Sequence, residues 1–358
     1  MLEKIIVFCV YGGKSTEHEV SLLSAKAMSN SLDREKYSLR LVYITEQGAW
    51  VNLGEAPKYI EDTSILRGKT DKTPAESIAD FLRDFPKGKK AICLLALHGT
   101  NGEDGRIQGL FDMAEIPYTG DDCMSSSLNM DKSVMKTLLS EAKIPQTKYL
   151  SFTAYDYNKN PDDFVDRAER ELGYPMFVKP ANGGSSVGTS RAANREEFKE
   201  SISLAFKYDY RVVCEREIVG REIQISVLGL DEPKASVPGE FIMERPFFDY
   251  DAKYIDKKII PIAPARMSAE TMEKMRDCAV RAYKATRVSG LARVDFFITE
   301  DESFYVCELN TMPGFTELSF TPVLWGKTDG TTYQGVVEKL IEMGFESYER
   351  RKKLSRHR

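Results

Sequence analysis

Two apolar stretches near the C-terminal end of the chain each carry one carboxylate, and this pattern is the strongest constraint on the fold. Asp295 lies in one stretch and Glu308 in the other, with the polar turn 300–303 between them, which predicts a β-hairpin. Asn310 follows on the same strand, so its amide oxygen is expected to face the same way. Acids packed together in apolar surroundings cost roughly several kcal/mol unless they hold a ligand. Such oxygens suit Mg²⁺ with its phosphate partners, so we predict a metal–nucleotide site rather than a solvated hairpin face.

The composition is that of a soluble globular protein with more than one domain. The chain has 358 residues, of which 42% are hydrophobic and 29% are charged, and this length favours two or three domains. The net charge of −5 gives no reason to expect a nucleic-acid partner. The basic run 350–358 is interpreted as a solvated C-terminal tail.

Cysteine usage and the first residues indicate a reducing, cytoplasmic setting. The chain has six scattered cysteines and no C-x-x-C pair, so no disulfide framework is expected. Residues 1–8 lead directly into a buried-strand pattern without the layout of a signal peptide. No stretch approaches the ~18 apolar residues of a membrane span, so no membrane partner is expected.

The N-terminal third predicts a doubly wound α/β domain over residues 1–123. A buried strand at 4–10 is followed by a glycine turn and a helical pattern, which is the opening of a βαβ unit. Further buried strands are predicted at 39–45 and 91–97. His98 follows the last of these strands, at the carboxyl edge where open α/β sheets collect ligands.

The remaining chain predicts two α+β lobes, at residues 124–214 and 215–358. Asn194 is expected to cap a helix, because a Glu follows three residues later. No internal repeat or low-complexity linker interrupts these lobes. The predicted helices cover 131–141, 195–206 and 269–287, and the predicted strands cover 174–180, 211–215 and 224–228.

Lys179 ends an apolar strand, where a charged side chain must be paired or bind a ligand. The loop 181–188 after it is rich in Gly, Ser and Asn, and such a loop can offer backbone N–H groups to phosphates. It lacks the Walker pattern, and a plain flexible turn is the alternative. Glu215 and Glu222 lie at a strand end further on, where they are either a solvated edge or contacts to adenine and ribose.

Three further features each have a plain and a functional interpretation. The aromatic segment 247–254 contains Lys253 and is either a core stripe or a lid over the site. Glu19 at a helix start is either a helix-dipole acid or a partner for a substrate ammonium. His98 is either a simply hydrogen-bonded imidazole or a site residue.

Taken in order, the motifs resemble those of the ATP-grasp ligases, and within them the D-alanine–D-alanine ligases, over nearly the whole chain. In that family the first D-alanine carboxylate attacks the γ-phosphate of ATP, and the amine of the second D-alanine then displaces phosphate from the acylphosphate. The resemblance therefore implies a two-lobed ATP-grasp fold after the N-terminal domain and a product used in the bacterial cell wall. The motifs that carry it are residues 12–21, 98–105, 130–132, 179–188, 249–254 and 308–316.

The resemblance also implies a role for each matching residue. Two Mg²⁺ ions, with Mn²⁺ as the alternative, would be held by Asp295, Glu308 and Asn310. ATP would be contacted at its phosphates by Lys132, Lys179 and Lys253, and at its adenine and ribose by Glu215, Arg216, Ile218 and Glu222. The substrates would be contacted by Glu19 and His98 (first D-alanine), by Arg293 and the Gly314 N–H (oxyanion), and by Ser319 and Phe320 (carboxylate of the second D-alanine).

The resemblance assigns acceptor selectivity to Tyr254, which in the family is hydrogen-bonded to the residues matching Ser185 and Glu19. A tyrosine here is typical of ligases that make the D-alanine dipeptide, whereas D-serine ligases can retain a similar loop. A lid over residues 246–256 and a homodimer are the family expectations.

Three other functions remain as alternatives. They are a different ATP-grasp carboxylate–amine or depsipeptide ligase, a non-catalytic nucleotide-binding module, and an NAD-binding protein. The absence of G-x-G-x-x-G argues against the last.

Overall fold

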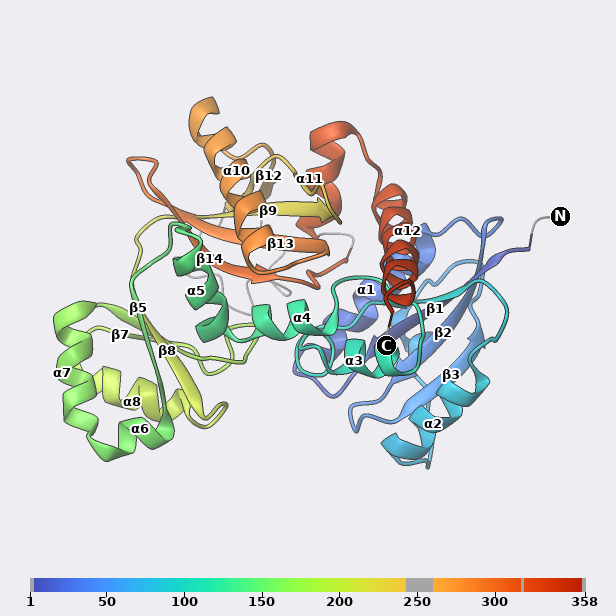
Figure 1. Cartoon of the computed structure of the whole chain (residues 1–358), viewed down its shortest axis with the longest axis horizontal. Coiled ribbons are helices and arrows are strands. Elements are labelled where there is room, and N and C mark those ends of the chain that lie inside the picture. Colours follow the sequence, from blue (N-terminus) through green and yellow to red (C-terminus); the bar gives the residue numbers. More distant parts are fainter. Residues whose placement is uncertain (1–2, 243–259, 317–318, 356–358) are drawn as a thin grey trace.

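The computed structural model describes residues 3–242, 260–316 and 319–355, which form three β-sheets with helices packed against them (Figure 1). The predicted lid 246–256, with Lys253 and Tyr254, lies outside the described residues. In the part of the chain that is described, no helix is both long enough and apolar enough to cross a membrane. All six cysteine thiols are free.

The first sheet has the order β3-β2-β1-β4, and two of its three pairings are parallel, which confirms the predicted parallel sheet in part. Strands β1, β2 and β4 are parallel, whereas the edge strand β3 is antiparallel to β2. The antiparallel edge follows from the short connection 45–49, because a turn of that length cannot make a parallel crossover. The strands are β1 (Ile5–Gly12), β2 (Tyr37–Ile44), β3 (Trp50–Glu55) and β4 (Ala91–Leu95).

Helices cover both faces of this sheet, as a doubly wound domain requires. Alternate residues of β1 enter two different cores, with Val7 and Cys9 in one and Phe8 in the other. Helix α12 from the far end of the chain joins the first core beside α1 (Figure 1). The covering helices are α1 (His18–Ser31), α2 (Pro74–Asp84), α3 (Arg106–Met113) and α12 (Tyr333–Lys352).

The second sheet is antiparallel with the order β5-β8-β6-β7. The predicted helix over 195–206 is confirmed, and Asn194 caps it by accepting a hydrogen bond from the Glu197 N–H at 3.0 Å. The predicted division between residues 214 and 215 falls inside β8. The elements are β5 (Tyr149–Thr153), α6 (Ala154–Lys159), α7 (Pro161–Glu171), β6 (Met176–Pro180), β7 (Ser190–Ala192), α8 (Arg195–Ala205) and β8 (Arg211–Arg216).

The third sheet contains the predicted carboxylate hairpin. Strands β13 and β14 pair antiparallel with Asp295 opposite Glu308, which confirms the hairpin. The register shifts after this pair so that Cys307 is an extra residue, and such bulges re-aim neighbouring side chains. The elements are β9 (Arg221–Gly229), β10 (Lys234–Ala235), β11 (Gly239–Ile242), β12 (Ile260–Ile262), α10 (Ala269–Ala285), β13 (Gly290–Ile298), β14 (Phe304–Asn310) and α11 (Phe320–Asp329).

Helix α10 packs on one face of the third sheet, against Ile225 and Val294. Helix α11 lies against the other face, where the Trp325 indole N–H donates to Ser226 Oγ at 2.9 Å. Helices α4 (Cys123–Met130) and α5 (Lys132–Glu141) lead from the first sheet toward the other two, and the short helix η1 (Thr63–Leu66) follows β3 and contacts α1. On the face of the third sheet that contacts α11, Gln224 and Ser226 of β9 lie opposite Asp295 and Arg293 of β13, which makes it the polar face of the sheet.

Candidate active site

Two adjoining hollows lie where the three sheets approach one another. The first, which we call the inner cavity, has a volume of about 330 Å³, and its lining includes Glu17, His98, Glu103, Arg293, Gly314 and Ser319. The second, which we call the outer cleft, has a volume of about 870 Å³, and its lining includes Lys179, Glu215, Arg216, Ile218, Glu222 and Asp295. Both are bordered by Lys132, Ser185, Gln224, Phe241 and Glu308.

The carboxylate hairpin forms the floor between the two hollows. Arg293 and Asp295 are two residues apart on β13 and so share a face, where the guanidinium makes two hydrogen bonds of 2.7 Å to the carboxylate. Glu308 lies opposite Asp295, and its carboxylate is 3.4 Å from Lys132 Nζ. Asn310 Oδ1 accepts a hydrogen bond from the Met312 N–H at 3.0 Å. These grouped carboxylate and amide oxygens fit a hard divalent cation such as Mg²⁺.

A buried charge cluster supports the floor of the outer cleft. Glu215 Oε2 is 2.9 Å from Lys179 Nζ, and Glu215 Oε1 is 3.2 Å from Lys136 Nζ. Burial would raise the pKa of Glu215, but the two lysines outweigh burial and lower the pKa to about 2. Burial likewise opposes the charge on Lys179, yet Glu215 raises the pKa of that amine overall. Lys179 is therefore a fixed cation at the end of its strand.

The glycine-rich loop after Lys179 has the backbone geometry of an anion-binding turn. Ser185 and Ser186 both have positive φ angles, of 47° and 60°, which non-glycine residues rarely adopt. Successive residues in unusual turn conformations can direct their N–H groups toward one point. Lys132 Nζ donates to the Gly183 carbonyl at 2.7 Å and so holds the loop beside the hairpin.

The structure corrects the position of the acid beside Ser185. Ser185 donates a hydrogen bond to Glu17 at 2.5 Å, and Glu17 lines the inner cavity, whereas Glu19 was expected there. The side chain of Glu19 is 59% exposed and pairs with Arg67 at 2.6 Å. Gly99 makes the close approach of the Glu17 carboxylate feasible, because any side chain at that position would clash with it.

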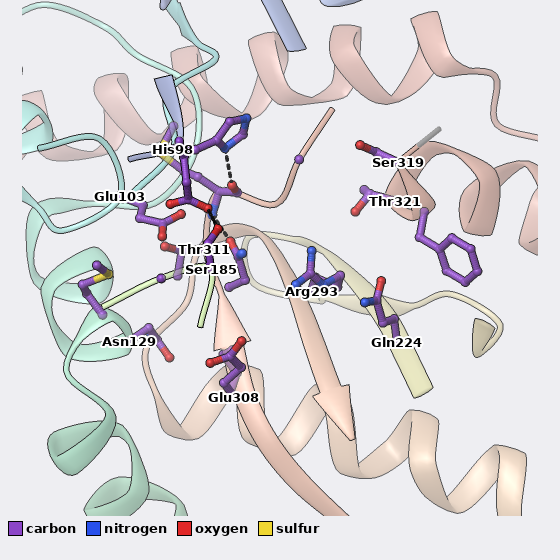
Figure 2. Close-up of a pocket in the computed structure, with 18 of the residues that line it drawn as sticks. His98, Glu103, Asn129, Ser185, Gln224, Arg293, Glu308, Thr311, Ser319 and Thr321 are labelled. Carbon is purple, nitrogen blue, oxygen red and sulfur yellow. Dashed lines mark hydrogen bonds between the residues drawn. The ribbon is translucent and has the colours of Figure 1, made fainter. Parts of the chain in front are cut away.

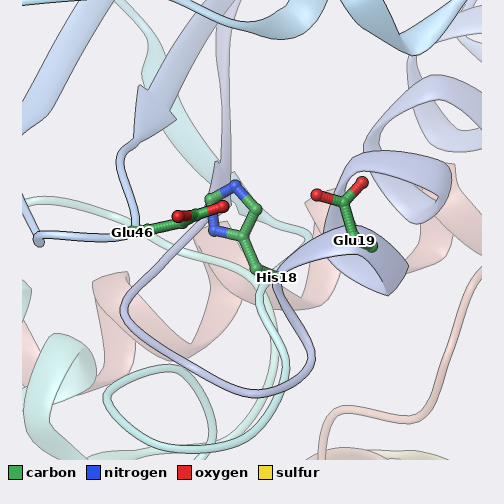
Figure 3. Close-up of side chains that lie close together, drawn as sticks. All are labelled: His18, Glu19 and Glu46. Carbon is green, nitrogen blue, oxygen red and sulfur yellow. The ribbon is translucent and has the colours of Figure 1, made fainter.

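Glu19 instead lies in a surface group with His18 and Glu46, whose ligand atoms are within 4.8 Å of one another (Figure 3). Both ring nitrogens of His18 already have hydrogen-bond partners, at 2.7 Å to the Gly13 carbonyl and 3.2 Å to the Tyr43 hydroxyl. Glu19 is also paired with Arg67, so contacts within the protein account for the positions of His18 and Glu19 without a bound metal ion.

His98 is a neutral imidazole with a defined tautomer. Its Nδ1–H donates to the Met312 carbonyl at 3.0 Å, so Nε2 accepts from the Ser24 hydroxyl at 2.8 Å. Ser24 in turn accepts from the Phe315 N–H at 3.1 Å, which leaves its proton for His98. Burial is the main cause that lowers the pKa of His98. His98 therefore ties α1 to the segment that follows β14.

Glu103 is a second acid in the inner cavity. Figure 2 shows it on the same side of the cavity as His98 and Ser185. Burial, together with the charges of Glu17 and Glu308, raises the pKa of Glu103 well above its usual range. Glu103 is thus a third acid in the lining of the inner cavity, besides Glu17 and Glu308.

The N-terminus of α11 closes the opposite side of the inner cavity. Ser319 is the N-cap residue, and its hydroxyl accepts from the Thr316 N–H at 2.8 Å. Gly314 and Phe320 line the cavity beside it, so the free N–H groups of the first helical turn are available to an anion. Arg293 lies between this helix terminus and Glu308 in Figure 2.

The structure brings most of the predicted site residues together. Arg216, Ile218 and Glu222 border the outer cleft, as expected for the end of β8 and the start of β9. Three residues were missed, namely Glu17, Glu103 and Lys136. Glu17 and Glu103 lie within the motifs 12–21 and 98–105, and Lys136 lies four residues after Lys132 on the same helix face, so each had a signal in the sequence.

Comparison with known proteins covers nearly the whole chain. The family models described as D-ala D-ala ligase N-terminus and D-ala D-ala ligase C-terminus match residues 6–121 and 138–342. The chain is 41% identical to the D-alanine--D-alanine ligase of Geobacillus thermodenitrificans, over 98% of both chains. It is 43% identical to that of Bacillus velezensis, over 95% of this chain and 97% of the relative.

Two solved structures are similar in fold. The D-alanine-D-alanine ligase from Coxiella burnetii has a TM-score of 0.79 and 30% identity, with 98% of this chain and 97% of that one covered. The VanG D-Ala:D-Ser ligase from Enterococcus faecalis also has a TM-score of 0.79, with 33% identity and with 96% and 100% covered.

Proposed function

Since the chain belongs to the D-alanine–D-alanine ligase family, we propose that it joins two molecules of D-alanine and converts one ATP to ADP and phosphate. The observation that carries this proposal is the meeting of the inner cavity and the outer cleft at Lys132, Ser185 and Glu308. A substrate carboxylate in the cavity and a terminal phosphate in the cleft would then be adjacent. Such positioning is the main requirement of phosphoryl transfer.

The outer cleft is the proposed nucleotide site. Lys179 supplies a fixed positive charge for phosphate oxygens, because Glu215 keeps it protonated. Lys132, held between Gly183 and Glu308, supplies a second charge at the boundary with the cavity. The end of β8 and the start of β9, with Arg216, Ile218 and Glu222, are the proposed contacts of the adenine and ribose, and Lys253 is a proposed third phosphate contact.

The hairpin is the proposed metal site, with two Mg²⁺ ions held by Asp295, Glu308 and Asn310, or Mn²⁺ in their place. Bound there, the metal supplies positive charge that offsets the charge on the phosphate oxygens during transfer. Arg293 orients Asp295 through its two hydrogen bonds. Asp295 and Glu308 both line the outer cleft, beside the proposed nucleotide site.

The inner cavity is the proposed site of the first D-alanine. Glu17 is suited to accept hydrogen bonds from its ammonium, a role that passes to Glu17 from the exposed Glu19. His98 is neutral and holds the cavity wall by bonding to the Met312 carbonyl. With the ammonium fixed at this end, an oxygen of the substrate carboxylate can attack the γ-phosphorus, release ADP and form D-alanyl phosphate.

The second D-alanine is proposed to bind beside the N-terminus of α11. Ser319 and the backbone of Phe320 can hold its carboxylate by hydrogen bonds and the helix dipole. Its neutral amine attacks the acyl carbon, and the oxyanion that forms is stabilised by Arg293 and the Gly314 N–H. Collapse of this intermediate breaks the C–O bond, phosphate leaves with the amine proton, and the dipeptide remains.

Membership of the family also supports a proposed cellular role, a proposed assembly and a proposed division into domains. The product would enter bacterial cell-wall synthesis, and the chain would act in the cytoplasm as a homodimer. Residues 1–123, 124–214 and 215–358 are the proposed domains, with the segment 246–256 as a lid that keeps water from the acylphosphate.

The test is an assay of all three products. With ATP, Mg²⁺ and D-alanine, the account predicts ADP, phosphate and D-alanyl-D-alanine in equal amounts, separated and identified by mass. Substitution of L-alanine for D-alanine is the matched control and should give no dipeptide. Phosphate release without dipeptide, or release that does not depend on D-alanine, would reject the proposal.

A further inference from the structure

Gln224 on β9 is a mostly buried residue in the wall shared by the inner cavity and the outer cleft. The residue is only 6% exposed, and it borders both the inner cavity and the outer cleft. Its side chain makes no hydrogen bond to any residue that the structure describes, although an amide can make up to four. Because it lines both hollows and has no partner among the described residues, this amide is available to hydrogen-bond a ligand.

Thr321, in the first turn of α11, is a second buried polar residue in the wall of the inner cavity. It is 1% exposed, and within the described part of the chain its hydroxyl has no hydrogen-bond partner. A threonine in a helix can usually bond back to a carbonyl of the preceding turn, which this position at the helix start does not allow. Thr321 and Phe320 line the inner cavity together with Gln224, and Figure 2 shows Gln224 and Thr321 on the same side of the cavity as Ser319.

The neighbours of Gln224 place this pair on the side of the cavity that receives the second substrate. On the same face of β9, Ser226 is covered by Trp325 of α11. The ladder partner of Gln224 on β11 is Gly239, and any side chain at Gly239 would clash with the ring of Phe320. Gln224 therefore emerges where the cover of α11 ends, next to Ser319 and Phe320.

The walls around the pair define what fits there. The rings of Phe241 and Phe320 lie 4.0 Å apart between their centroids and limit the room to a small group. The nearby cation Arg293 is already directed at Asp295, so the pair itself presents only neutral donors and acceptors. A neutral amide and a neutral hydroxyl match a hydroxyl group better than a phosphate or a second carboxylate.

We propose that Gln224 and Thr321 form a polar subsite for the side chain of the second substrate, so that the chain also accepts a D-amino acid with a hydroxymethyl side chain, D-serine. The inference rests on the proposed ligase function and concerns only its acceptor. The bond changes are the same as with D-alanine: the serine nitrogen bonds to the acyl carbon, the bond to phosphate breaks, and the proton leaves with phosphate.

The test is a competition between D-alanine and D-serine as acceptors. Both amino acids are supplied with ATP and Mg²⁺, and the two dipeptides are measured by mass to give the ratio of their kcat/KM values. The intact chain should form D-alanyl-D-serine. Thr321→Val and Gln224→Leu should each lower the D-serine to D-alanine ratio by about threefold to tenfold, which corresponds to one lost neutral hydrogen bond.

Two further variants separate the subsite from general damage. Thr321→Ser retains the hydroxyl and should restore the ratio of the unaltered chain, even if thermal unfolding shows that Thr321→Val is less stable. Gln334→Leu, on the exposed face of α12 where the amide bonds to Glu338 at 3.0 Å, should not change the ratio.

Each outcome decides the matter. Formation of D-alanyl-D-alanine without any mixed dipeptide would overturn the subsite and leave the ligase function intact. An unchanged ratio in both Thr321→Val and Gln224→Leu would also overturn the subsite. Absence of every dipeptide would overturn the ligase proposal, and the subsite with it.

Discussion

The Ser185 hydroxyl donates a hydrogen bond of 2.5 Å to the Glu17 carboxylate, although the two residues are 168 positions apart. Ser185 belongs to the glycine-rich loop after β6, and Glu17 precedes α1. The bond therefore joins the loop at the proposed phosphate site to the domain that holds the first substrate. It also fixes the Glu17 carboxylate within the inner cavity.

The first prediction separates the two acids at the start of α1. Glu17→Gln should lower kcat/KM for D-alanine by about 10- to 100-fold, because a charge-assisted bond to the substrate ammonium is weakened. Glu19→Gln is the matched control, since that side chain is exposed and pairs with Arg67. ADP release at varied D-alanine measures both. A larger loss in Glu19→Gln would return the role to Glu19.

The second prediction concerns the buried lysine behind the outer cleft. Lys136→Met removes one of the two lysines that pair with the buried Glu215 carboxylate, so it should lower the free energy of unfolding by about 3 kcal/mol. It should also raise KM for ATP more than KM for D-alanine, because Glu215 positions Lys179. Urea unfolding and ADP release measure these effects.

Lys274→Met is the control for this change, because Lys274 forms an exposed ion pair with Glu270 on α10. Such pairs contribute little, so its unfolding curve and KM for ATP should stay as in the unaltered chain. Equal destabilisation of the two variants would show that Lys136 is not a structural charge.

The third prediction is a pH dependence of stability that originates at His98. Burial lowers the folded pKa of His98 below the ordinary value of 6.5, so the unfolded state binds the proton first. Stability is therefore complete above pH 6.5 and falls as pH decreases below it, by up to about 1.4 kcal/mol per pH unit. His98→Gln should flatten this part of the curve in urea unfolding. An identical slope in both proteins would remove His98 as the cause.

The fourth prediction concerns Tyr254, which lies outside the described residues. Tyr254→Phe should raise ester formation with D-lactate relative to dipeptide formation by about tenfold at low pH, because a hydroxyl that favours the amine acceptor is lost. Mass analysis of the two products gives the ratio. No change in the ratio would take Tyr254 out of acceptor selection.

The fifth prediction concerns the hairpin. Glu308→Gln should lower Mg²⁺-dependent ADP formation by about a thousandfold, because metal charge on the phosphates is worth several kcal/mol. Turnover is measured over a titration of Mg²⁺ and of Mn²⁺. Near-normal turnover at ordinary Mg²⁺ would exclude Glu308 as a ligand.

The hairpin could be predicted from sequence because its signal is local. The alternation around Asp295 and Glu308 and the polar turn between them specify two paired strands, and the pairing is as expected. The strand–loop pattern around Lys179 is equally local, and β6 ends one residue after it. These elements locate most of the proposed nucleotide and metal contacts.

The predictions from sequence were wrong or incomplete where contacts between distant parts of the chain determine which side chain enters the site. Glu17 and Glu19 are both acids at the start of one helix, and only the positions of Gly99 and Ser185 determine which of them enters the cavity. Lys136 was missed because a fully buried lysine is rare without a partner, and its partner Glu215 lies 79 positions away by their numbers. The packing of α12 on the first sheet also has no local sequence signal.

The most direct test of the central claim follows an oxygen atom. D-Alanine labelled with ¹⁸O in its carboxylate is supplied with unlabelled ATP and Mg²⁺, and the phosphate product is analysed by mass. If a carboxylate oxygen attacks the γ-phosphorus, each phosphate released with a dipeptide carries one ¹⁸O atom. Dipeptide formed together with unlabelled phosphate would contradict the acylphosphate and the arrangement of cavity and cleft proposed to make it.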